Sequence, residues 1–453
     1  MLQLFDTAKG GVVPFEPREP GKVSMYVCGP TVYGPPHLGH GRFSLVFDVL
    51  RRYLTWAGND VTYVSNITDI DDKIIQRAQA ESRDWREITR RCEAVWYRAM
   101  DALDVRRPDH DPHATAYVEE MVALIGRLVD KGAAYGTSDG VYFHSEAVDD
   151  YGLLARQPLD SLKAGARVEG IDEKRSPVDF ALWKKAKPGE PHWPSPWGDG
   201  RPGWHTECVV MSLDLLGEDF DLHGGGQDLA FPHHENERAQ ALADGRRFAR
   251  TWVHNGFVEV EGTKMSKSLG NVSNLVDLVE QYDPRAYRLL VLRSHYRSPI
   301  DVTDDSLRDA EAALDRLDAF ARRATSVEAL AGAAPDPDAL GQFRAAMDDD
   351  LQTPTATGLL FDLVRRANVA LDAGDAAAAA PLAAGVFEIA GALGLALRTE
   401  AATAPDEVLA WAAERDAARA AKDWARADAL RDQITAAGYV VEDTPAGAVV
   451  RPA

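Results

Sequence analysis

Two histidines and a glycine stand where an expected strand gives way to an expected helix. The segment reads His37-Leu-Gly-His40, and a phosphate at such a helix start would meet free backbone N–H groups and the positive end of the helix dipole. Gly39 would let a nucleotide approach the backbone closely, and both imidazoles could donate hydrogen bonds to phosphate oxygens. For this motif taken alone, a loop with two incidental histidines is an equal alternative.

A second candidate for phosphate chemistry is the segment Lys264-Met-Ser-Lys-Ser268. Two lysines three residues apart on a loop can move onto a triphosphate and neutralise the charge that leaves as pyrophosphate. A solvated surface loop is the alternative for this segment alone. The two motifs occur in this order on two halves of one expected sheet, which argues against coincidence and indicates nucleotide chemistry.

Four further side chains form a candidate metal site: Cys28, Cys208, His233 and Glu237. His233 and Glu237 are four residues apart, hence on one face of a helix expected to begin after Pro232. Each cysteine falls at an expected strand end or ligand-facing loop. Two thiolates, an imidazole and a carboxylate suit zinc, and the thiolates argue against magnesium or calcium. The remaining cysteine, Cys92, is interpreted as a structural residue of a helix.

These residues must be positioned by a doubly wound α/β sheet. Buried runs at 23–28 and 61–65, with a helical pattern over 41–56 between them, predict strand, helix and strand. Ligands of such sheets bind beyond the carboxyl ends of the strands, here around Cys28, Gly29 and Thr68. The pattern resumes over 219–226 and 252–260. The stretch of about 133–203, which begins with an expected hairpin around 138–140, is interpreted as an insertion.

The sequence therefore predicts three parts. Residues 1–303 form a Rossmann-like catalytic domain, residues 304–398 an all-α bundle, and residues 405–453 a small helix-hairpin module. In that module one helix is expected over 407–437, with Trp424 on its apolar side. Basic residues spaced four, three and four apart would form a stripe on one face of this helix, either for RNA or as a solvated face. They are Arg415, Arg419, Lys422 and Arg426.

Composition limits the class of protein. The 453 residues include 27% charged and 45% hydrophobic residues, typical of a globular protein, and only three cysteines, too few for a disulfide framework. No run of 18 apolar residues and no secretory signal is seen, so we expect a cytoplasmic protein without a membrane span. The net charge of −21 argues against a protein coated in nucleic acid, although a local basic stripe could bind some.

His37-Leu-Gly-His40 and the KMSKS segment at 264–268 resemble the two signatures of class I aminoacyl-tRNA synthetases. Four further segments are similar to the cysteinyl-tRNA synthetase family: Cys28-Gly-Pro-Thr-Val-Tyr33, Asn66-Ile-Thr-Asp-Ile-Asp-Asp-Lys73, Gly203-Trp-His-Thr-Glu-Cys208 and Phe231-Pro-His-His-Glu-Asn-Glu237. The resemblance implies that cysteine is activated with ATP to cysteinyl-adenylate and transferred to the 2′-OH at the 3′ end of tRNA(Cys).

It also implies the partners and roles of single residues. One Zn²⁺ per chain would be held by the four residues of the candidate metal site and would select cysteine over serine by binding its thiolate, and Mg²⁺ would accompany ATP. Gly29 and Thr68 would lie beside the amino acid, with Trp204 either walling the pocket or merely packing. Gly226 and Asp228, with Gly225, would bind adenosine, the carboxylate taking the ribose hydroxyls. The module at 405–453 would contact the anticodon. The role of His205 stays open, and we expect a monomer.

Two rival functions share parts of this pattern. A related ligase of mycothiol synthesis makes the same adenylate but passes cysteine to the amine of a glucosaminyl inositol, and it lacks an extended tail such as residues 405–453. A catalytically idle paralogue acting as an RNA-binding protein would be indicated by degraded motifs, whereas both motifs are intact in this sequence.

Overall fold

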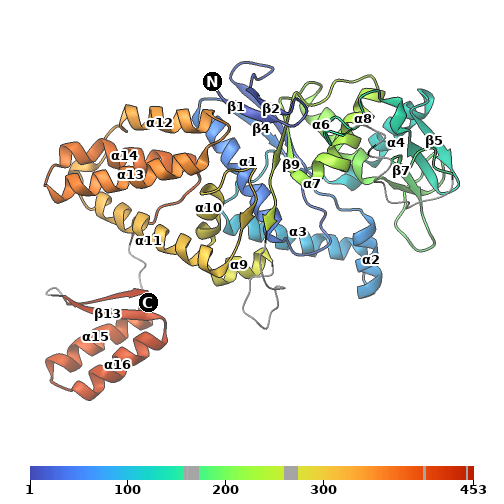
Figure 1. The fold of residues 1–453 in the computed structure, drawn as a ribbon. Coiled ribbons are helices and arrows are strands. Elements are labelled where there is room, and N and C mark those ends of the chain that lie inside the picture. Colours follow the sequence, from blue (N-terminus) through green and yellow to red (C-terminus); the bar gives the residue numbers. More distant parts are fainter. Residues whose placement is uncertain (158–160, 162–172, 260–273, 401–404, 445–446, 453) are drawn as a thin grey trace.

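The fold centres on a four-stranded parallel sheet in the order β10-β9-β3-β4. The structure is a computed structural model that describes residues 1–157, 161, 173–259, 274–400, 405–444 and 447–452 (Figure 1). The strands of the sheet are β3 (Lys22–Val27), β4 (Asp60–Val64), β9 (Leu222–Gly226) and β10 (Thr251–Asn255). The predicted doubly wound α/β fold is confirmed.

The topology of this sheet creates its binding edge. From β3 the chain crosses through α1 (Leu38–Trp56) to β4 on one side, whereas β9 pairs with β3 on the other side. The carboxyl ends of β3 and β9 therefore flank the point where strand order reverses, which is where ligands bind in such sheets. Helices that carry or support this edge are α2 (Asp72–Glu81), α3 (Trp85–Ala102), α6 (Trp204–Leu216), α7 (Gln227–Leu229), η3 (Ala230–His234), α8 (Glu235–Ala243), α9 (Leu275–Gln281) and α10 (Pro284–Leu292).

The stretch expected as an insertion forms a second, antiparallel sheet in the order β5-β6-β7-β8. A two-residue turn at 138–139 joins the first two strands, close to the expected hairpin. The sheet is tied to α2 by Asp72, whose carboxylate pairs with Lys184 Nζ at 2.6 Å and with Arg201. Its elements and those leading to it are η1 (Ala114–Tyr117), α4 (Val118–Asp130), β5 (Ala134–Thr137), β6 (Gly140–Phe143), η2 (Ser145–Ala147), β7 (Phe180–Lys185) and β8 (Gly200–Pro202).

A helical bundle lies on the opposite side of the parallel sheet from this insertion (Figure 1). The short strands β11 (Val258–Glu259) and β12 (Ile300–Asp301) pair just before it. Apolar faces of its helices share one core with α1 and α10. The bundle contains α11 (Asp304–Thr325), η5 (Glu328–Leu330), α12 (Pro337–Asp348), α13 (Thr353–Asp372) and α14 (Ala376–Ala392). In the described part of the chain, no helix combines the length and apolarity needed to cross a membrane.

An N-terminal hairpin was not predicted. Strands β1 (Gln3–Asp6) and β2 (Gly11–Pro14) pair antiparallel, and the backbone N–H of Phe5 donates to Asp350 Oδ1 at 2.8 Å. Each strand is only four residues long, so its pattern is too short to be recognised, and its position depends on a residue 345 positions further along the chain.

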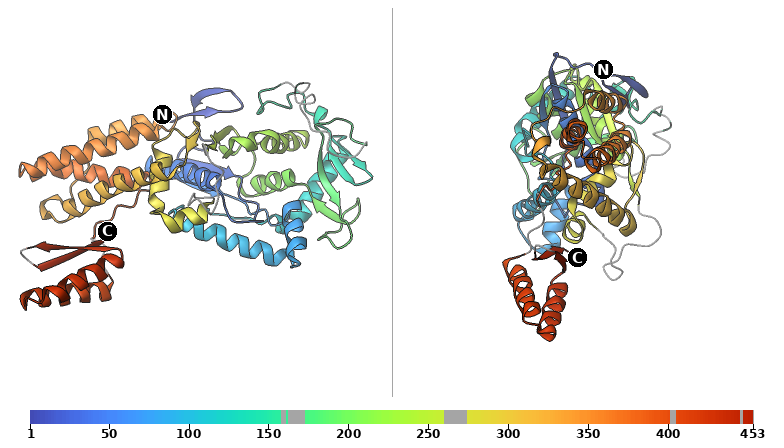
Figure 2. Two further views of the ribbon diagram at one scale, coloured as in Figure 1. Left: turned by 60° about the horizontal axis from the view of Figure 1, so that its bottom comes forward. Right: turned by 90° about the vertical axis from the view of Figure 1, so that its left-hand side faces the viewer.

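The C-terminal module corrects one prediction. The single helix expected over 407–437 is two helices, α15 (Asp406–Ala420) and α16 (Trp424–Ala436), followed by strands β13 (Tyr439–Thr444) and β14 (Gly447–Pro452). Lys422 has a φ of +61°, which reverses the chain, and Asp423 caps α16 by accepting from the N–H of Arg426 at 3.1 Å. Figure 2 shows the module apart from the bundle in two further views.

The expected single-face basic stripe is therefore wrong. Arg415 and Arg419 belong to α15, Lys422 to the turn and Arg426 to α16. Arg415 is only 7% exposed, so it is part of the module's interior. Arg426 forms an ion pair with Glu414 at 2.6 Å across the helix pair. Trp424, expected to pack on the apolar side, is 59% exposed.

A buried charge cluster joins the sheet domain to the bundle. Asp48 of α1 accepts from Arg52 Nε at 2.8 Å and from Arg288 Nη1 of α10 at 2.7 Å. The side chains of Asp48 and Arg288 are each only 1% exposed. Arg288 also donates to the carbonyl oxygens of Leu103, at 2.9 Å, and of Leu393, at 3.4 Å, just beyond α14. One guanidinium thus holds α1, α10, the end of α3 and the end of α14 together.

Replacing Asp48 by alanine should destabilise the protein by about 3–5 kcal/mol, because the buried Arg288 loses the carboxylate it pairs with and Arg52 keeps only Asp104. Asp309→Ala is the matched control, since its 2.7 Å ion pair with Arg293 leaves the Asp309 side chain 72% exposed, and it should cost less than about 1 kcal/mol. Thermal unfolding and resistance to proteolysis measure both effects. Equal losses in the two variants would contradict the assigned importance of the buried cluster.

Candidate metal centre and active site

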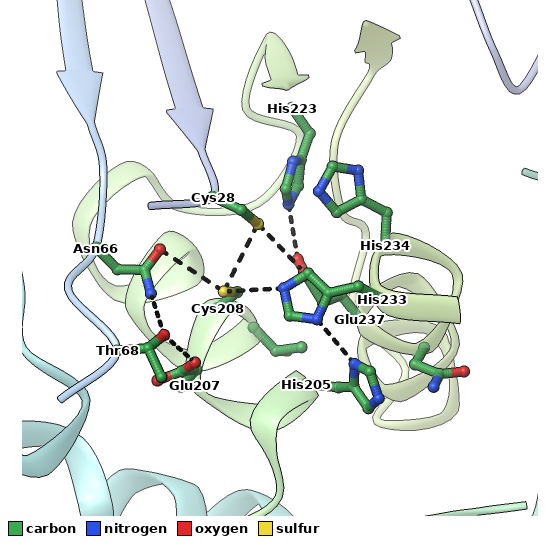
Figure 3. Close-up of polar contacts among 12 residues, drawn as sticks. Cys28, Asn66, Thr68, His205, Glu207, Cys208, His223, His233, His234 and Glu237 are labelled. Carbon is green, nitrogen blue, oxygen red and sulfur yellow. Dashed lines mark hydrogen bonds and ion pairs between the residues drawn. The ribbon is translucent and has the colours of Figure 1, made fainter. Parts of the chain in front are cut away.

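Four buried side chains converge at the carboxyl end of β3 (Figure 3). Cys28 Sγ lies 3.7 Å from Cys208 Sγ and 3.4 Å from Glu237 Oε1. His233 Nε2 lies 3.6 Å from Cys208 Sγ and 2.9 Å from Glu237 Oε1. All four residues are at most 3% exposed. The structure thus brings together the complete set of metal ligands expected from the sequence, from β3, α6, η3 and α8.

The spacing of these donor atoms fits a zinc ion. A tetrahedral ion with Zn–S bonds of about 2.3 Å and Zn–N bonds of about 2.0 Å separates two sulfurs by roughly 3.8 Å and a sulfur from a nitrogen by roughly 3.5 Å. The observed separations are 3.7 Å between the two sulfurs and 3.6 Å between Cys208 Sγ and His233 Nε2. The donors are two thiols, an imidazole and a carboxylate, a combination that favours zinc over the oxygen-binding cations.

Outer contacts orient the ligands. His223 of β9, with no measurable exposure, lies 2.7 Å from Glu237 Oε2 through its Nε2 atom. His205 Nδ1 lies 2.8 Å from His233 Nδ1, so His205 contacts a candidate ligand. Such partners fix the orientation of ligating side chains. A second arrangement of donors, Cys28, His223, His234 and Glu237, is also compact, but it contains one thiol instead of two.

Burial and mutual charge set the ionisation of this cluster. Burial alone would lower the pKa of His233, but Glu237 and Cys208 outweigh it and raise the pKa to about 10. Burial raises the pKa of the Cys28 thiol, and the adjacent Cys208 and Glu237 raise it further. The neighbouring carboxylate and thiols thus favour a positive charge at this position, which is the electrostatic condition that also attracts a metal cation.

The expected amino-acid pocket adjoins the thiols. The backbone N–H of Gly29 donates to Asn66 Oδ1 at 2.9 Å, and Asn66 Nδ2 donates to Thr68 Oγ1 at 3.2 Å. Thr68 in turn donates to Glu207, a fully buried carboxyl whose pKa is raised well above its usual value by burial and by the charge of Cys208. Trp204, 39% exposed, stacks on the His233 ring at 4.0 Å. Gly29, Thr68 and Trp204 therefore lie beside the cluster.

The two histidines of the HxGH segment cap α1 reciprocally. His40 Nδ1 accepts from the His37 N–H at 3.1 Å, and His37 Nδ1 accepts from the His40 N–H at 3.3 Å. A neutral ring whose Nδ1 accepts carries its hydrogen on Nε2. Burial, the other ring and Lys73 lower the pKa of His40 to about 3. Both rings, stacked at 3.6 Å, then offer Nε2–H donors while uncharged at pH 7.

At Gly39 and Gly226, neighbouring atoms leave no room for a larger residue. A Cβ on Gly39 would lie 3.0 Å from His37 Cε1, so the absence of a side chain here leaves room for the stacked histidine pair. This reason adds to the close approach of a nucleotide that was expected from the sequence. A Cβ on Gly226, at the end of β9, would lie 2.5 Å from Asp228 Oδ1. The charge of Asp228 raises the pKa of His37 against the larger effect of burial, which places this carboxylate on the same side of the site. Lys264 and Lys267 lie outside the described residues.

Several participants were missed by sequence reasoning. His223 contacts Glu237, Asn66 lies within hydrogen-bonding distance of Cys208, and Glu207 accepts from Thr68. Polar residues inside buried segments were the available signal, since a buried polar group needs a partner. The segment at 66–73 was quoted for its resemblance, but the amide of Asn66 was not assigned a contact with Gly29.

Comparison with known proteins defines the class. Residues 14–312 match the family model described as the class I (C) tRNA synthetase catalytic domain, and residues 342–398 match a DALR domain. A solved structure of Mycobacterium tuberculosis methionyl-tRNA synthetase in complex with methionyl-adenylate has the same fold, with a TM-score of 0.61 and 17% identity over 82% of this chain and 89% of that chain. The parallel sheet, the histidine pair and these matches define a class I aminoacyl-tRNA synthetase.

The family is defined more narrowly by close relatives. Cysteine–tRNA ligases from Halorhodospira halophila and Azotobacter vinelandii are each 47% identical to this chain, which is covered to 99%, with 98% and 99% of the relatives covered. Residues 404–451 match the cysteinyl-tRNA ligase anticodon binding domain. The chain belongs to the cysteine–tRNA ligase family, as its resemblance predicted. The match of its tail does not favour the rival ligase that uses a glucosaminyl inositol.

Replacing Gly29 by alanine should disturb the end of β3, because the new Cβ would lie 1.7 Å from the carbonyl oxygen of Asn66. Overpacking of this kind costs roughly 1–3 kcal/mol, which a shift of the thermal unfolding midpoint measures. The matched control is Gly126→Ala within α4, where a Cβ would meet open space. This substitution should stabilise the helix by up to about 1 kcal/mol. If Gly29→Ala unfolds like the wild type, the close approach is not a constraint.

Proposed function

We propose that this chain activates L-cysteine with ATP to cysteinyl-adenylate and transfers it to the 3′ end of tRNA(Cys). The observation that carries the proposal is the position of two different sites at one strand end. Cys28 directly follows β3 and lies among the metal donors, and His37 and His40 begin the helix that follows β3. A thiol-binding centre beside a phosphate-binding helix start is what the activation of cysteine requires.

Adenylate formation needs positioning and charge stabilisation. The cysteine carboxylate is ionised at pH 7 and attacks the α-phosphorus without a general base, while pyrophosphate leaves. The neutral His37 and His40 donate from Nε2 to phosphate oxygens, and Lys264 and Lys267 neutralise the departing charge, with Mg²⁺ on the phosphates. Gly226 and Asp228 bind adenosine through the ribose hydroxyls.

Cysteine is selected through its sulfur. We assign Cys28, Cys208, His233 and Glu237 to one Zn²⁺ per chain, which supplies a soft Lewis acid that a thiolate binds far better than a neutral hydroxyl does. A hydrophobic pocket alone discriminates poorly between near-isosteric side chains. Gly29, Thr68 and Trp204 enclose the amino acid beside this centre.

The C-terminal module serves the tRNA. We divide the chain into a catalytic domain at 1–303, a helical bundle at 304–398 and an anticodon-contacting module at 405–453. Arg419, Lys422 and Arg426 remain our candidates for phosphate contacts, whereas the buried Arg415 supports the module from inside. Transfer to the terminal 2′-OH completes the reaction. The proposed enzyme is a cytoplasmic monomer.

Metal analysis should find one zinc per chain, and Cys208→Ser should lose it. The free energy of zinc binding to such a site is about 10–16 kcal/mol. If the four ligands share it equally, losing one ligand removes about 3 kcal/mol, which lowers the zinc affinity about 100-fold. Cysteine affinity should fall with zinc content while ATP affinity changes little. Cys92→Ser is the matched control, because Cys92 is buried in a separate small core. Active protein that contains no zinc would disprove the assignment.

Removing residues 405–453 should separate the two halves of the reaction. Cysteine-dependent ATP–pyrophosphate exchange should persist, since the residues assigned to activation precede residue 270. Charging of tRNA should fall steeply, and its salt dependence should flatten by roughly 0.7–0.9 in log–log slope for each phosphate that the protein no longer neutralises. A truncated chain that charges tRNA at the full rate would contradict the role of the module. A full-length chain that modified glucosaminyl inositol instead would support the rival ligase.

A further inference from the structure

One lysine close to the HxGH histidines has no role in the function proposed above. Lys73 is the second residue of α2, and its side chain is exposed. Its Nζ atom lies 5.1 Å from the centre of the Tyr33 ring. Tyr33 belongs to the loop that runs from the end of β3 into His37, so the ammonium group lies beside the segment that delivers the histidine pair.

The structure holds α2 and this loop in a fixed relation. Thr31 and Thr68 form a parallel bridge. The N–H of Val32 donates to the Thr68 carbonyl at 3.1 Å, and the N–H of Thr68 donates to the Pro30 carbonyl at 3.0 Å. Arg77, one turn further along α2, donates to the carbonyl oxygen of Tyr33. Lys73 is therefore presented from a rigid element.

The three acidic residues nearest to Lys73 in the sequence each bind a group other than its ammonium. Asp69 accepts from Thr115 Oγ1 at 2.6 Å. Asp71 caps α2 by accepting from the backbone N–H of Lys73 at 2.8 Å. Asp72 pairs with Lys184 and Arg201 of the second sheet. Among the described residues, no carboxylate forms an ion pair with the Lys73 ammonium, although the chain carries a net charge of −21.

The charge of Lys73 acts on both histidines of the HxGH segment. It contributes, after the larger effect of burial, to lowering the pKa of both His37 and His40. A field that disfavours positive imidazolium rings favours a negative phosphate at the same place. The ammonium lies over an aromatic face instead of a carboxylate, so it can turn to a phosphate without breaking an ion pair.

We propose that Lys73 is a phosphate-binding residue that contacts the β- and γ-phosphates of ATP and stabilises the departing pyrophosphate. The inference rests on the function proposed above. In this step a bond forms between a cysteine carboxylate oxygen and the α-phosphorus, and the bond from that phosphorus to the bridging oxygen breaks. The bridging oxygen keeps the electron pair, and Lys73 offsets the negative charge that develops on pyrophosphate.

The test is cysteine-dependent ATP–pyrophosphate exchange with the full-length protein and Lys73→Met. We expect kcat for exchange to fall about 10- to 100-fold, less than for a buried donor because Lys73 is exposed and screened. The KM for cysteine should change little, and Lys73→Arg should recover most of the rate because it keeps the charge. Tyr33→Leu should have a much smaller effect, since it removes the ring and leaves the ammonium.

Lys174→Met is the matched control. Lys174 lies over the ring of Tyr142 at 6.0 Å, which is a similar contact in the second sheet, away from the histidines. It should leave exchange unchanged. Exchange at the wild-type rate in Lys73→Met would overturn the inference, as would a normal exchange rate combined with slow transfer to tRNA, which would assign Lys73 to the acceptor end. Absence of cysteine-dependent exchange in the wild type would instead overturn the proposed function.

Discussion

The position of α1 depends on two buried charges, and the active site depends on α1. Asp48 meets the guanidiniums of Arg52 and Arg288 at less than 3 Å. Six residues earlier, the buried Arg42 donates to the carbonyl oxygen of Phe257, just before β11, and to that of Tyr296 at 3.1 Å, shortly before β12. A buried charge is costly when a partner is removed, so α1 cannot slide along its axis without a large penalty. The histidine pair in its first turn is positioned by the same constraint.

Much of the catalytic sheet could be predicted because its chemically distinctive residues lie at the ends of its strands. A buried run ends at Cys28, a helical pattern begins near His37, and parallel strands align their carboxyl ends at one edge. The break between α15 and α16 was missed because alanine-rich, charged sequence continues across it. Only the capping role of Asp423 signalled it locally. The N-terminal hairpin could not be predicted, since its backbone bonds to Asp350, 345 positions further along the chain.

The donors of the candidate metal centre could be identified from sequence, whereas the residues that orient them could not. Spacing placed His233 and Glu237 on one helical face, but nothing local pairs His223 with Glu237 or Glu207 with Thr68. The site also combines neutral histidines with charged lysines. Burial keeps the capping histidines neutral, and in the proposed mechanism the full positive charge is left to lysines. Neutral donors avoid the repulsion that two adjacent imidazolium rings would suffer.

The thiol pair has a consequence for how the chain emerges from the ribosome. Cys28 and Glu237 are separated by 209 positions, which at about 5–20 residues per second corresponds to roughly 10–40 s of synthesis. Until residue 208 has been synthesised, β3 can have β4 beside it but neither β9 nor any of the other three donors. The N-terminal half must therefore remain soluble with an open sheet edge and with Cys28 separated from the other donors, and a nascent chain gains its complete donor set only after more than half of its length has been translated.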